Sequence, residues 1–306
     1  MWGGTNDRDA IEAIRASIDN GVTTIDTAAI YGFGHSEKLV GQAIRGKREK
    51  VVVATKCGMR WDSPVGSDPW PQKDESGKDL VIRKNSKPDS IVWECEQSLK
   101  RLGIDVIDLY QIHRPDVETP VEDSMRALEK LRQQGKIRAI GVSNFSQDWI
   151  KRAAAVAPLA SNQPPYSILQ RGIEADVLPY CREHNIATIC YSPLERGLLA
   201  GAVGPERKFP PSDHRSGHKL FTVENRQRIA DVLQKIKPIA DAHKASFAQT
   251  IIQWTIHQPG ITAALVGARN AEQAEHNARA MDFSFPAREF AEIRQAFDEC
   301  AKLIAK

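Results

Sequence analysis

The chain has 306 residues, and with 41% hydrophobic and 26% charged residues its composition is that of a globular protein, which excludes a disordered or fibrous chain. The net charge is only +3, and no cluster of basic residues is interleaved with aromatic ones, so we expect no nucleic-acid partner. The five cysteines form no CxxC pair, so the sequence predicts neither a disulfide framework nor a metal site.

The apolar runs are too short to cross a membrane. The longest, at 51–54 and 261–266, fall far short of the ~20 residues that span a bilayer. The opening residues, MWGGTNDRD, have neither the basic end nor the apolar stretch of a signal peptide. We therefore expect a soluble cytoplasmic protein with reduced thiols and no membrane partner.

Short β-branched runs predict seven strands, with amphipathic helical patterns between them. The expected strands are residues 23–28, 51–57, 106–112, 137–143, 160–163, 186–192 and 263–268. A first helix carries Ile11, Ile14 and Ile18 on one face and stops at Gly21. The repeating unit is thus a strand followed by a helix.

Start and stop signals delimit two further helices. One opens at residues 86–89 and ends at Gly103. The other begins with a capping box at residues 119–122, in which Pro120 takes the first helical position after Thr119, and it ends at Gly135.

Nearly continuous apolar strands that alternate with helices indicate a parallel sheet buried on both faces, either doubly wound or closed into a barrel. A doubly wound nucleotide-binding sheet would carry GxGxxG after a strand, but the nearest match, residues 32–37, has Glu37 in place of the third glycine. This favours a (β/α)8 TIM barrel that spans residues 1–306 as one domain. Because only seven strands are found, we expect the first strand to be missing upstream of Met1.

Two long segments, residues 59–85 and 195–222, are rich in Pro, Gly and charge, and each follows the carboxyl end of a strand. In a barrel both would overhang the face where active sites lie, as walls or lids of a substrate pocket. The alternative is that they are tolerated surface insertions.

Four polar residues lie at or just after strand carboxyl ends: Asp26, Tyr31, Lys56 and His113. Taken singly, each has a structural explanation, such as a helix cap, a solvated strand end or a core histidine. Since all four would point into one barrel mouth, together they favour a catalytic site.

Five segments, IDTAAIYGFGHSEKLVGQAI, ATKCG, SLKRLGIDVIDLYQIHRPD, GVSNF and GARNAEQAEHNA, occur in order across nearly the whole chain and resemble the signatures of the aldo-keto reductase family. The segment YSPLERGLLAG is most similar to the bacterial branch that carries YSPLxxGLL. The resemblance implies a barrel that binds NADPH without a Rossmann fold. It also implies reduction of aldehydes or ketones, sugar-like carbonyls among them, to alcohols.

The family's catalytic tetrad maps onto the four residues at the strand ends. Tyr31 would be the general acid, which must supply a proton as charge grows on the carbonyl oxygen. A tyrosine hydroxyl, with an ordinary pKa of about 10, needs a nearby cation for this task. The resemblance implies that Lys56 is that cation, that Asp26 holds Lys56, and that His113 orients the substrate oxygen.

The cofactor positions follow from the same resemblance. Ser143, Asn144 and Gln163 match the side chains that bond the nicotinamide carboxamide, and Tyr191 matches the ring that stacks on it. The segment draped over the pyrophosphate is matched by Ser192, Leu194 and Gly197.

Near the end of the chain, Asn270 and Gln273 predict a capping box at a helix amino end, which is an anion site. Arg269 adds a full charge suited to the 2′-phosphate of NADPH. Gln273 and Asn277, one helical turn apart, would face the adenosine. Gly267 belongs to the same cofactor segment.

The substrate is a small carbonyl compound that the sequence does not name. Phe33, Trp61 and Trp70 are candidate apolar walls of its pocket, and Arg114 stands where the similar bacterial branch often has Trp. Two alternatives remain: a non-catalytic NADPH sensor, as in the potassium-channel beta subunits that share this fold, and a Schiff-base aldolase that uses Lys56.

Overall fold

The computed structural model describes residues 6–74, 76–210, 213 and 215–304. They fall into two compact units. The first unit comprises residues 14–164 and 175–189, and the second comprises the described parts of 1–13, 165–174 and 190–306. Helix α1 (Asp7–Asp19) and strand β9 (Ala187–Tyr191) each have residues in both. The organisation of residues 1–306 as one domain stays a prediction.

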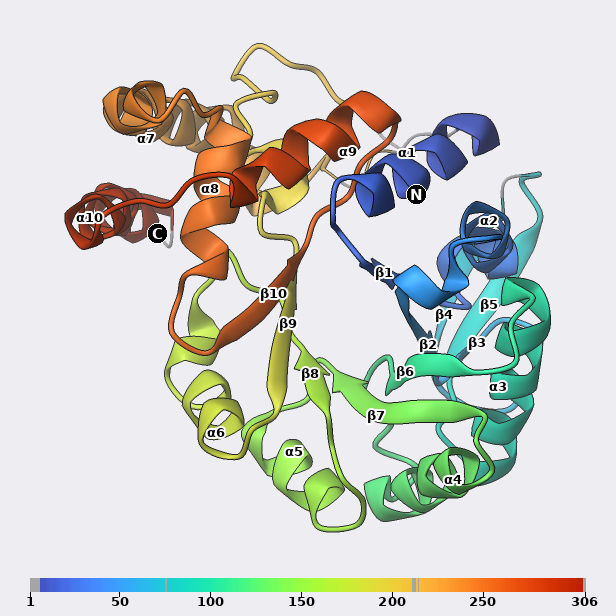
Figure 1. Ribbon diagram of the computed structural model, residues 1–306. Coiled ribbons are helices and arrows are strands. Elements are labelled where there is room, and N and C mark those ends of the chain that lie inside the picture. Colours follow the sequence, from blue (N-terminus) through green and yellow to red (C-terminus); the bar gives the residue numbers. More distant parts are fainter. Residues whose placement is uncertain (1–5, 75, 211–212, 214, 305–306) are drawn as a thin grey trace. The chain divides into compact units, whose positions relative to one another are not determined.

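The first unit is built on a parallel sheet with the strand order β1, β2, β6, β7, β8 and β9. Its strands are β1 (Thr24–Asp26), β2 (Val52–Cys57), β6 (Ile107–Ile112), β7 (Ile137–Ser143), β8 (Ser161–Gln163) and the start of β9. Its helices are α2 (His35–Ala43), α3 (Pro88–Leu102), α4 (Val121–Gln133), α5 (Gln147–Ala154) and α6 (Val177–Glu183), with 3-10 turns η1 (Tyr31–Gly34) and η2 (Arg48–Lys50). In Figure 1 the helices α3 to α6 lie outside the strands β6 to β8.

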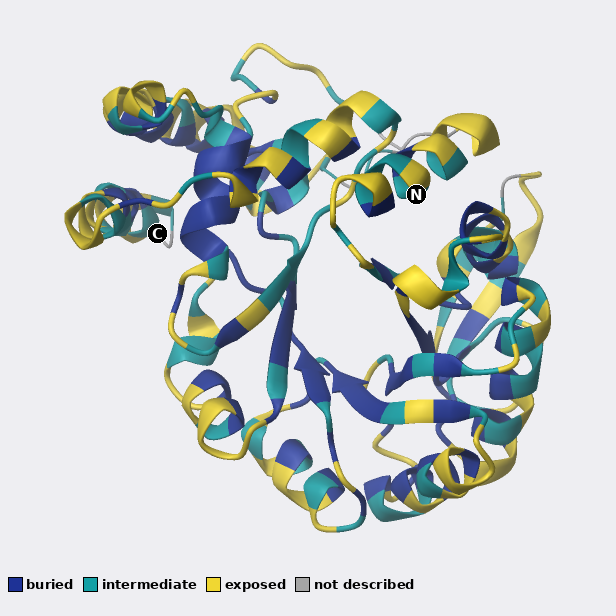
Figure 2. Ribbon diagram, in the orientation of Figure 1, coloured by how far each residue is buried: buried dark blue, intermediate teal, exposed yellow. Residues whose placement is uncertain are grey.

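The strands are apolar because both of their faces are covered. Figure 2 shows β6, β7 and β8 as largely buried, while the outer faces of α4 and α5 are exposed. The parallel register aligns Lys56 with Gln111, Gln111 with Gly141, and Gly141 with Ser161. The polar residues Lys56, Gln111 and Ser161 therefore share one row across the sheet, with Gly141 between the last two.

The segment at residues 59–85, expected as a wall or lid of a substrate pocket or as a surface insertion, forms a second sheet that the sequence pattern did not predict. It contains β3 (Met59–Arg60), β4 (Ser67–Lys73) and β5 (Asp79–Lys84), antiparallel and in the order β3-β5-β4. Strand β4 contains Pro69 and Pro71, and proline cannot donate a hydrogen bond to a ladder. They are tolerated because β4 is an edge strand.

The predicted helix ends are correct in one case and wrong in another. Gly103 closes α3 in the left-handed conformation with φ 64°, as predicted. The capping box expected at Thr119 does not form, because Pro120 is the N-cap of α4 and no side chain caps that helix end. The Thr119 hydroxyl instead donates to Asp116.

The second unit is mostly helical. It contains α7 (Val223–Ala242), α8 (Phe247–Ile256), α9 (Ala271–Ala278), α10 (Ala287–Ile304) and β10 (Ile261–Leu265), with 3-10 turns η3 (Gly172–Glu174), η4 (Glu195–Gly197), η5 (Lys219–Phe221) and η6 (Arg279–Met281). Helix α8 is buried almost throughout (Figure 2) and starts with a capping box between Ser246 and Gln249. No helix in the described part of the chain is long and apolar enough to span a bilayer.

Apart from β3, β4 and β5, the described residues form the seven predicted strands, and none of them precedes α1. Strand β10 starts two residues earlier than the predicted 263–268. Part of the segment 195–222, at residues 211, 212 and 214, lies outside the described residues. Its role as a lid over the site stays a prediction.

Gly41 on α2 lies close to the end of α3, because a Cβ there would lie 2.3 Å from the Leu102 carbonyl oxygen. Helix propensity favours Gly41→Ala by about 1 kcal/mol. The contact is to backbone, which cannot rotate away, so we expect the variant to lose about 1–3 kcal/mol of stability in urea unfolding. Lys38→Ala, exposed on the same helix, should change stability by less than about 0.5 kcal/mol. A more stable Gly41→Ala protein would contradict this packing.

Candidate active site

A buried ion pair lies at the carboxyl ends of β1 and β2. The Lys56 ammonium donates to Asp26 Oδ2 at 2.6 Å and to the Thr27 carbonyl oxygen at 2.9 Å. The Lys56 side chain is fully buried, and that of Asp26 is 13% exposed. The second Asp26 oxygen accepts from the Gln163 amide at 2.8 Å, so both carboxylate oxygens are bound.

Lys56 keeps its charge in this environment. Burial lowers the pKa of Lys56. The electrostatic interactions with Asp26 and Tyr31, together with hydrogen bonds to both, outweigh burial, so the pKa of Lys56 is raised above its ordinary value. The side chain is therefore an ammonium throughout the neutral pH range.

Tyr31 lies beside this ammonium, in the 3-10 turn η1 that follows β1. Lys56 Nζ is 5.2 Å from the centroid of the Tyr31 ring, and the His113 ring meets the same ring edge-on, with centroids 5.7 Å apart. Tyr31 is 39% exposed, so solvent or a substrate can reach it. The structure thus brings together the four residues predicted as a catalytic tetrad.

His113 is neutral at pH 7. Burial, followed by the positive charges of Lys56 and Arg114, holds the pKa of His113 well below its usual range. A neutral imidazole has one N–H to donate to an oxygen.

Three polar residues predicted to bind the nicotinamide lie next to the tetrad, at the ends of β7 and β8. The Gln163 carbonyl oxygen accepts from Ser143 Oγ at 2.8 Å and from the Asn144 backbone N–H at 3.2 Å. Asn144, in the left-handed conformation with φ 63°, also donates its side-chain amide to the His113 carbonyl oxygen at 3.0 Å. These hydrogen bonds link the carboxyl ends of β6, β7 and β8 and gather their polar side chains beside the tetrad.

Glu94 on α3 is a buried residue that the sequence reasoning missed. Both of its carboxyl oxygens accept from the Gly58 N–H, at 3.1 and 3.2 Å, and Oε1 also accepts from Ser90 Oγ at 3.2 Å. Gly58 comes two residues after Lys56, so Glu94 anchors the end of the strand that carries the ammonium. Burial raises the pKa of Glu94 to about 8, although the charge of Arg60 opposes this.

The aromatic residues predicted as substrate walls form one cluster. Phe33, Trp61 and Trp70 pack against a small apolar core, and the rings of Phe33 and Trp61 are 5.6 Å apart. The residues of this core are Ala28, Ile30, Met59 and Ile82. Arg114, the fourth predicted pocket residue, is exposed.

The predicted pyrophosphate segment of the second unit has a strained backbone. Ser192 has φ 61°, and the consecutive residues Glu195, Arg196 and Gly197 have φ 44°, 55° and 88°. Non-glycine residues in this region cost free energy and persist only where their surroundings fix them. Ser167 Oγ donates to the buried Glu195 carboxylate at 2.5 Å and helps to hold the turn. Tyr191 and Leu194 belong to the same segment.

At the amino end of α9, Asn270 caps the helix as predicted, because its Oδ1 accepts from the Gln273 N–H at 2.9 Å. In a capping box the Gln273 side chain would accept from the N–H of Asn270, the N-cap residue. Here Gln273 Oε1 accepts instead from the N–H of the preceding residue, Arg269, at 2.9 Å. Asn277 donates to the Gly267 carbonyl oxygen at 3.4 Å. The Arg269 side chain is exposed beside this helix end.

Comparisons with known proteins identify the family. The model of the aldo/keto reductase family matches residues 1–298. The chain belongs to the aldo/keto reductase family. Its fold is accordingly of the (β/α)8 class, and it is an oxidoreductase that uses a nicotinamide cofactor.

Two relatives and one solved structure are similar to this aldo/keto reductase over most of its length. The chain is 40% identical to the aldo-keto reductase YhdN of Bacillus subtilis, over 90% of this chain and 79% of that one. It is 36% identical to the NADH-specific methylglyoxal reductase of Escherichia coli, over 92% and 86%. The structure of the glycerol dehydrogenase AKR11B4 from Gluconobacter oxydans has a TM-score of 0.88 and 38% identity, covering 97% of this chain and 88% of that one.

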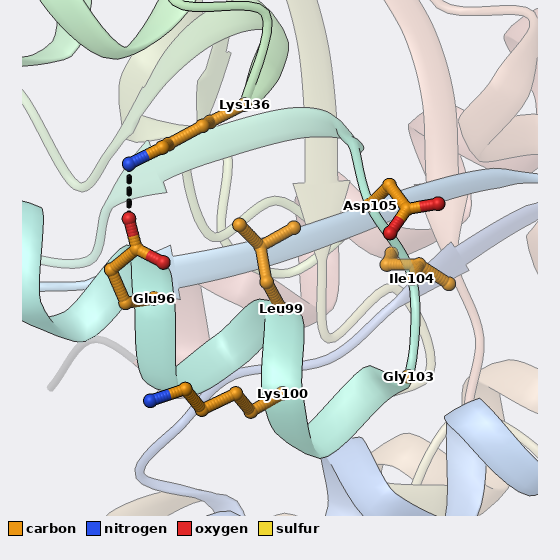
Figure 3. A pocket seen from close by; sticks show the side chains of 7 residues that line it. All are labelled: Glu96, Leu99, Lys100, Gly103, Ile104, Asp105 and Lys136. Carbon is orange, nitrogen blue, oxygen red and sulfur yellow. Dashed lines mark hydrogen bonds and ion pairs between the residues drawn. The ribbon is translucent and has the colours of Figure 1, made fainter.

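One surface hollow of this aldo/keto reductase lies away from the tetrad. Figure 3 shows it between the end of α3 and the starts of β6 and β7, with an ion pair between Lys136 and Glu96 across it. The tetrad lies at the opposite, carboxyl ends of the strands. No group of three or more potential metal ligands gathers within the described ranges of the chain.

The buried Glu94 carboxyl makes stability depend on pH. The unfolded chain releases this proton near pH 4.5 and the folded chain near pH 8, so the free energy of unfolding falls as pH rises between these values. Glu94→Gln removes the titration and should be more stable than the wild type at pH 9 by up to about 5 kcal/mol, with little difference at pH 5.

Urea unfolding at pH 5, 7 and 9 measures this slope. Glu96→Gln, on the same helix with its side chain 38% exposed, is the matched control for the loss of one carboxylate from α3. Parallel profiles for Glu94→Gln and the wild type would show that Glu94 is not protonated in the folded state.

Proposed function

We propose that the protein is an NADPH-dependent reductase of aldehydes or ketones, with Tyr31 as the general acid. The observation that carries this proposal is the Lys56 ammonium, buried, clamped by Asp26 and Thr27, and 5.2 Å from the Tyr31 ring. A fixed cation beside a partly exposed tyrosine is the arrangement that proton donation to a growing alkoxide requires.

Each residue of the tetrad has a separate task. A nicotinamide bound beside the tetrad would supply the hydride. Tyr31 Oη gives its proton to the substrate oxygen, and the Lys56 charge stabilises the phenolate left behind. His113, neutral and edge-on to Tyr31, donates its N–H to the same oxygen and orients the carbonyl. Asp26 keeps the ammonium in place.

The donor set suits the cofactor. A carboxamide both donates and accepts hydrogen bonds, as do the hydroxyl of Ser143 and the amides of Asn144 and Gln163, which lie together beside the tetrad. In the second unit, the amino end of α9 offers backbone N–H groups to a phosphate, whereas the N–H groups of Glu195 and Gly197 are bonded within their own turn.

The preference for NADPH rests on Arg269. A guanidinium next to a helix amino end favours a phosphate over a bare ribose hydroxyl. The relative from Escherichia coli is named as NADH-specific, so the family alone does not decide the choice of cofactor. We also propose that the protein is cytoplasmic and that its substrate is a small carbonyl compound.

The charged state of Lys56 argues against a Schiff-base aldolase. Formation of a Schiff base needs a neutral amine to attack the carbonyl. The Asp26 and Tyr31 contacts instead raise the pKa of Lys56 above its ordinary value, in spite of burial.

Tyr31→Phe removes only the hydroxyl, so steady-state reduction of an aldehyde panel, followed by NADPH absorbance, should fall by ~10²–10⁴. The dissociation constant for NADPH should stay within about twofold, because the hydroxyl acts on the substrate oxygen. Tyr180→Phe, a matched change on α6, should leave the rate unchanged. If Tyr31→Phe reduces the aldehydes at a rate within a few-fold of the wild type, Tyr31 is not the general acid. If the wild type binds NADPH but reduces none of the aldehydes, the protein is a sensor and not a reductase.

Arg269→Ala should weaken NADPH binding by roughly 10- to 100-fold, because a charge-assisted hydrogen bond contributes about 1.5–3 kcal/mol. NADH has no phosphate there, so its affinity should change by less than about threefold. Titration by tryptophan fluorescence measures both constants. Arg279→Ala, just beyond the other end of α9, is the control and should spare both affinities. Equal losses for the two cofactors would mean that Arg269 does not read the 2′-phosphate.

A further inference from the structure

One buried carboxylate in the first unit collects four hydrogen bonds. Asp116, 4% exposed, accepts from Ser67 Oγ at 2.9 Å and from the Glu118 N–H at 3.2 Å on Oδ1. Its Oδ2 accepts from the Ser86 N–H at 3.0 Å and from Thr119 Oγ1 at 2.8 Å. A carboxylate is needed here, because a neutral amide has one acceptor oxygen in place of two.

The four donors come from three separate segments. Ser67 is the first residue of β4, and Ser86 lies two residues before α3 begins. The other two donors belong to the loop after β6, the same loop that starts with His113. Asp116 therefore links the β3-β5-β4 sheet and the start of α3 to the segment that carries a member of the tetrad.

The ionised form of Asp116 is the one the fold holds. Burial would raise the pKa of Asp116, but the hydrogen bonds from Ser86, Thr119, Ser67 and Glu118 together lower it below its ordinary value. The link to the sheet is therefore intact throughout the pH range in which an enzyme would be assayed.

The base of the β3-β5-β4 sheet is fixed by other bonds that do not involve Asp116. The Asn85 N–H donates to the Gly58 carbonyl oxygen at 3.2 Å, and its side chain donates to the Val65 carbonyl oxygen at 3.3 Å. Ser124 Oγ donates to the Ser86 carbonyl oxygen at 2.7 Å. The Ser67–Asp116 bond is thus a side-chain link from β4 itself to the His113 loop.

Strand β4 carries part of the aromatic cluster. Trp70 lies three residues after Ser67, and with Phe33 and Trp61 it packs against Met59 and Ile82. Any shift of β4 moves Trp70 relative to Tyr31 and His113, whereas Lys56 and Asp26 are held by strands of the parallel sheet.

We propose that Asp116 is a positioning residue for substrate selection: by holding β4 against the His113 loop it fixes the aromatic wall and sets the affinity for carbonyl compounds that carry an aromatic ring. This inference rests on the proposed reductase function. The chemical step, which uses the tetrad, does not depend on the link.

The test compares an aryl aldehyde with a small one. The KM for 4-nitrobenzaldehyde should rise by about tenfold in both variants, because Ser67→Ala removes a hydrogen bond to a buried charge and Asp116→Asn removes the charge itself. Methylglyoxal carries no ring that could pack on the aromatic wall, so its KM should change by less than about twofold, and kcat for both compounds should stay within about twofold. Thr119→Val is the matched control, because it removes a bond to the same carboxylate within the His113 loop and spares the link to β4.

Hydrogen exchange of the cofactor-free protein gives a readout that needs no activity. Amides of residues 67–74 and 76–84 should exchange faster in Asp116→Asn and Ser67→Ala, and at the wild-type rate in Thr119→Val. Ser67→Ala, at the end of an edge strand, still tests the link to β4 if Asp116→Asn fails to fold.

Unchanged KM values for 4-nitrobenzaldehyde in both variants, with an active wild type, would overturn the proposal. An equal rise in KM for both aldehydes would overturn it too, since Asp116 would then support the site as a whole. A wild type that reduces neither compound would refute the proposed function instead, and the exchange rates would still decide whether Asp116 holds β4.

Discussion

The site depends on a positive charge kept inside the protein. Moving an ammonium out of water costs several kcal/mol unless it is paired and hydrogen-bonded. Lys56 has both kinds of partner in Asp26 and Thr27, and Asp26 is held in turn by Gln163 on β8. This chain of contacts joins β1, β2 and β8, so the parallel sheet must form correctly before the charge can be buried. Fold and site are therefore parts of one arrangement.

Gln163 connects two tasks that are separate in the sequence. Its amide binds Asp26, and its backbone carbonyl oxygen binds Ser143 and Asn144. A ligand held by these residues would contact the same side chain that steadies the ammonium partner. Binding of that ligand and the placing of the Asp26 carboxylate would then be coupled through Gln163 at the end of β8.

Much of this arrangement is predictable from sequence, because β-branched runs define the strands and a polar residue at the end of an apolar strand stands out, as Lys56 and His113 do. The family resemblance adds the roles. Residues whose importance comes from tertiary contacts escape such reasoning. Glu94 reads as an ordinary polar residue of an amphipathic helix, and only the approach of Gly58 explains its burial. Thr119 matches a capping pattern, but Asp116 takes its hydroxyl.

The prolines of β4 have one more consequence. An exposed strand edge presents a row of free N–H and C=O groups that can pair with another molecule, and this is a common route to aggregation. Pro69 and Pro71 each remove a donor from the edge of the β3-β5-β4 sheet. The chain can therefore carry Trp70 of the aromatic cluster on an antiparallel sheet without offering neighbouring molecules a regular ladder of backbone donors. The two prolines that make β4 hard to recognise as a strand from sequence thus also make its edge a poor template for pairing with a strand of another molecule.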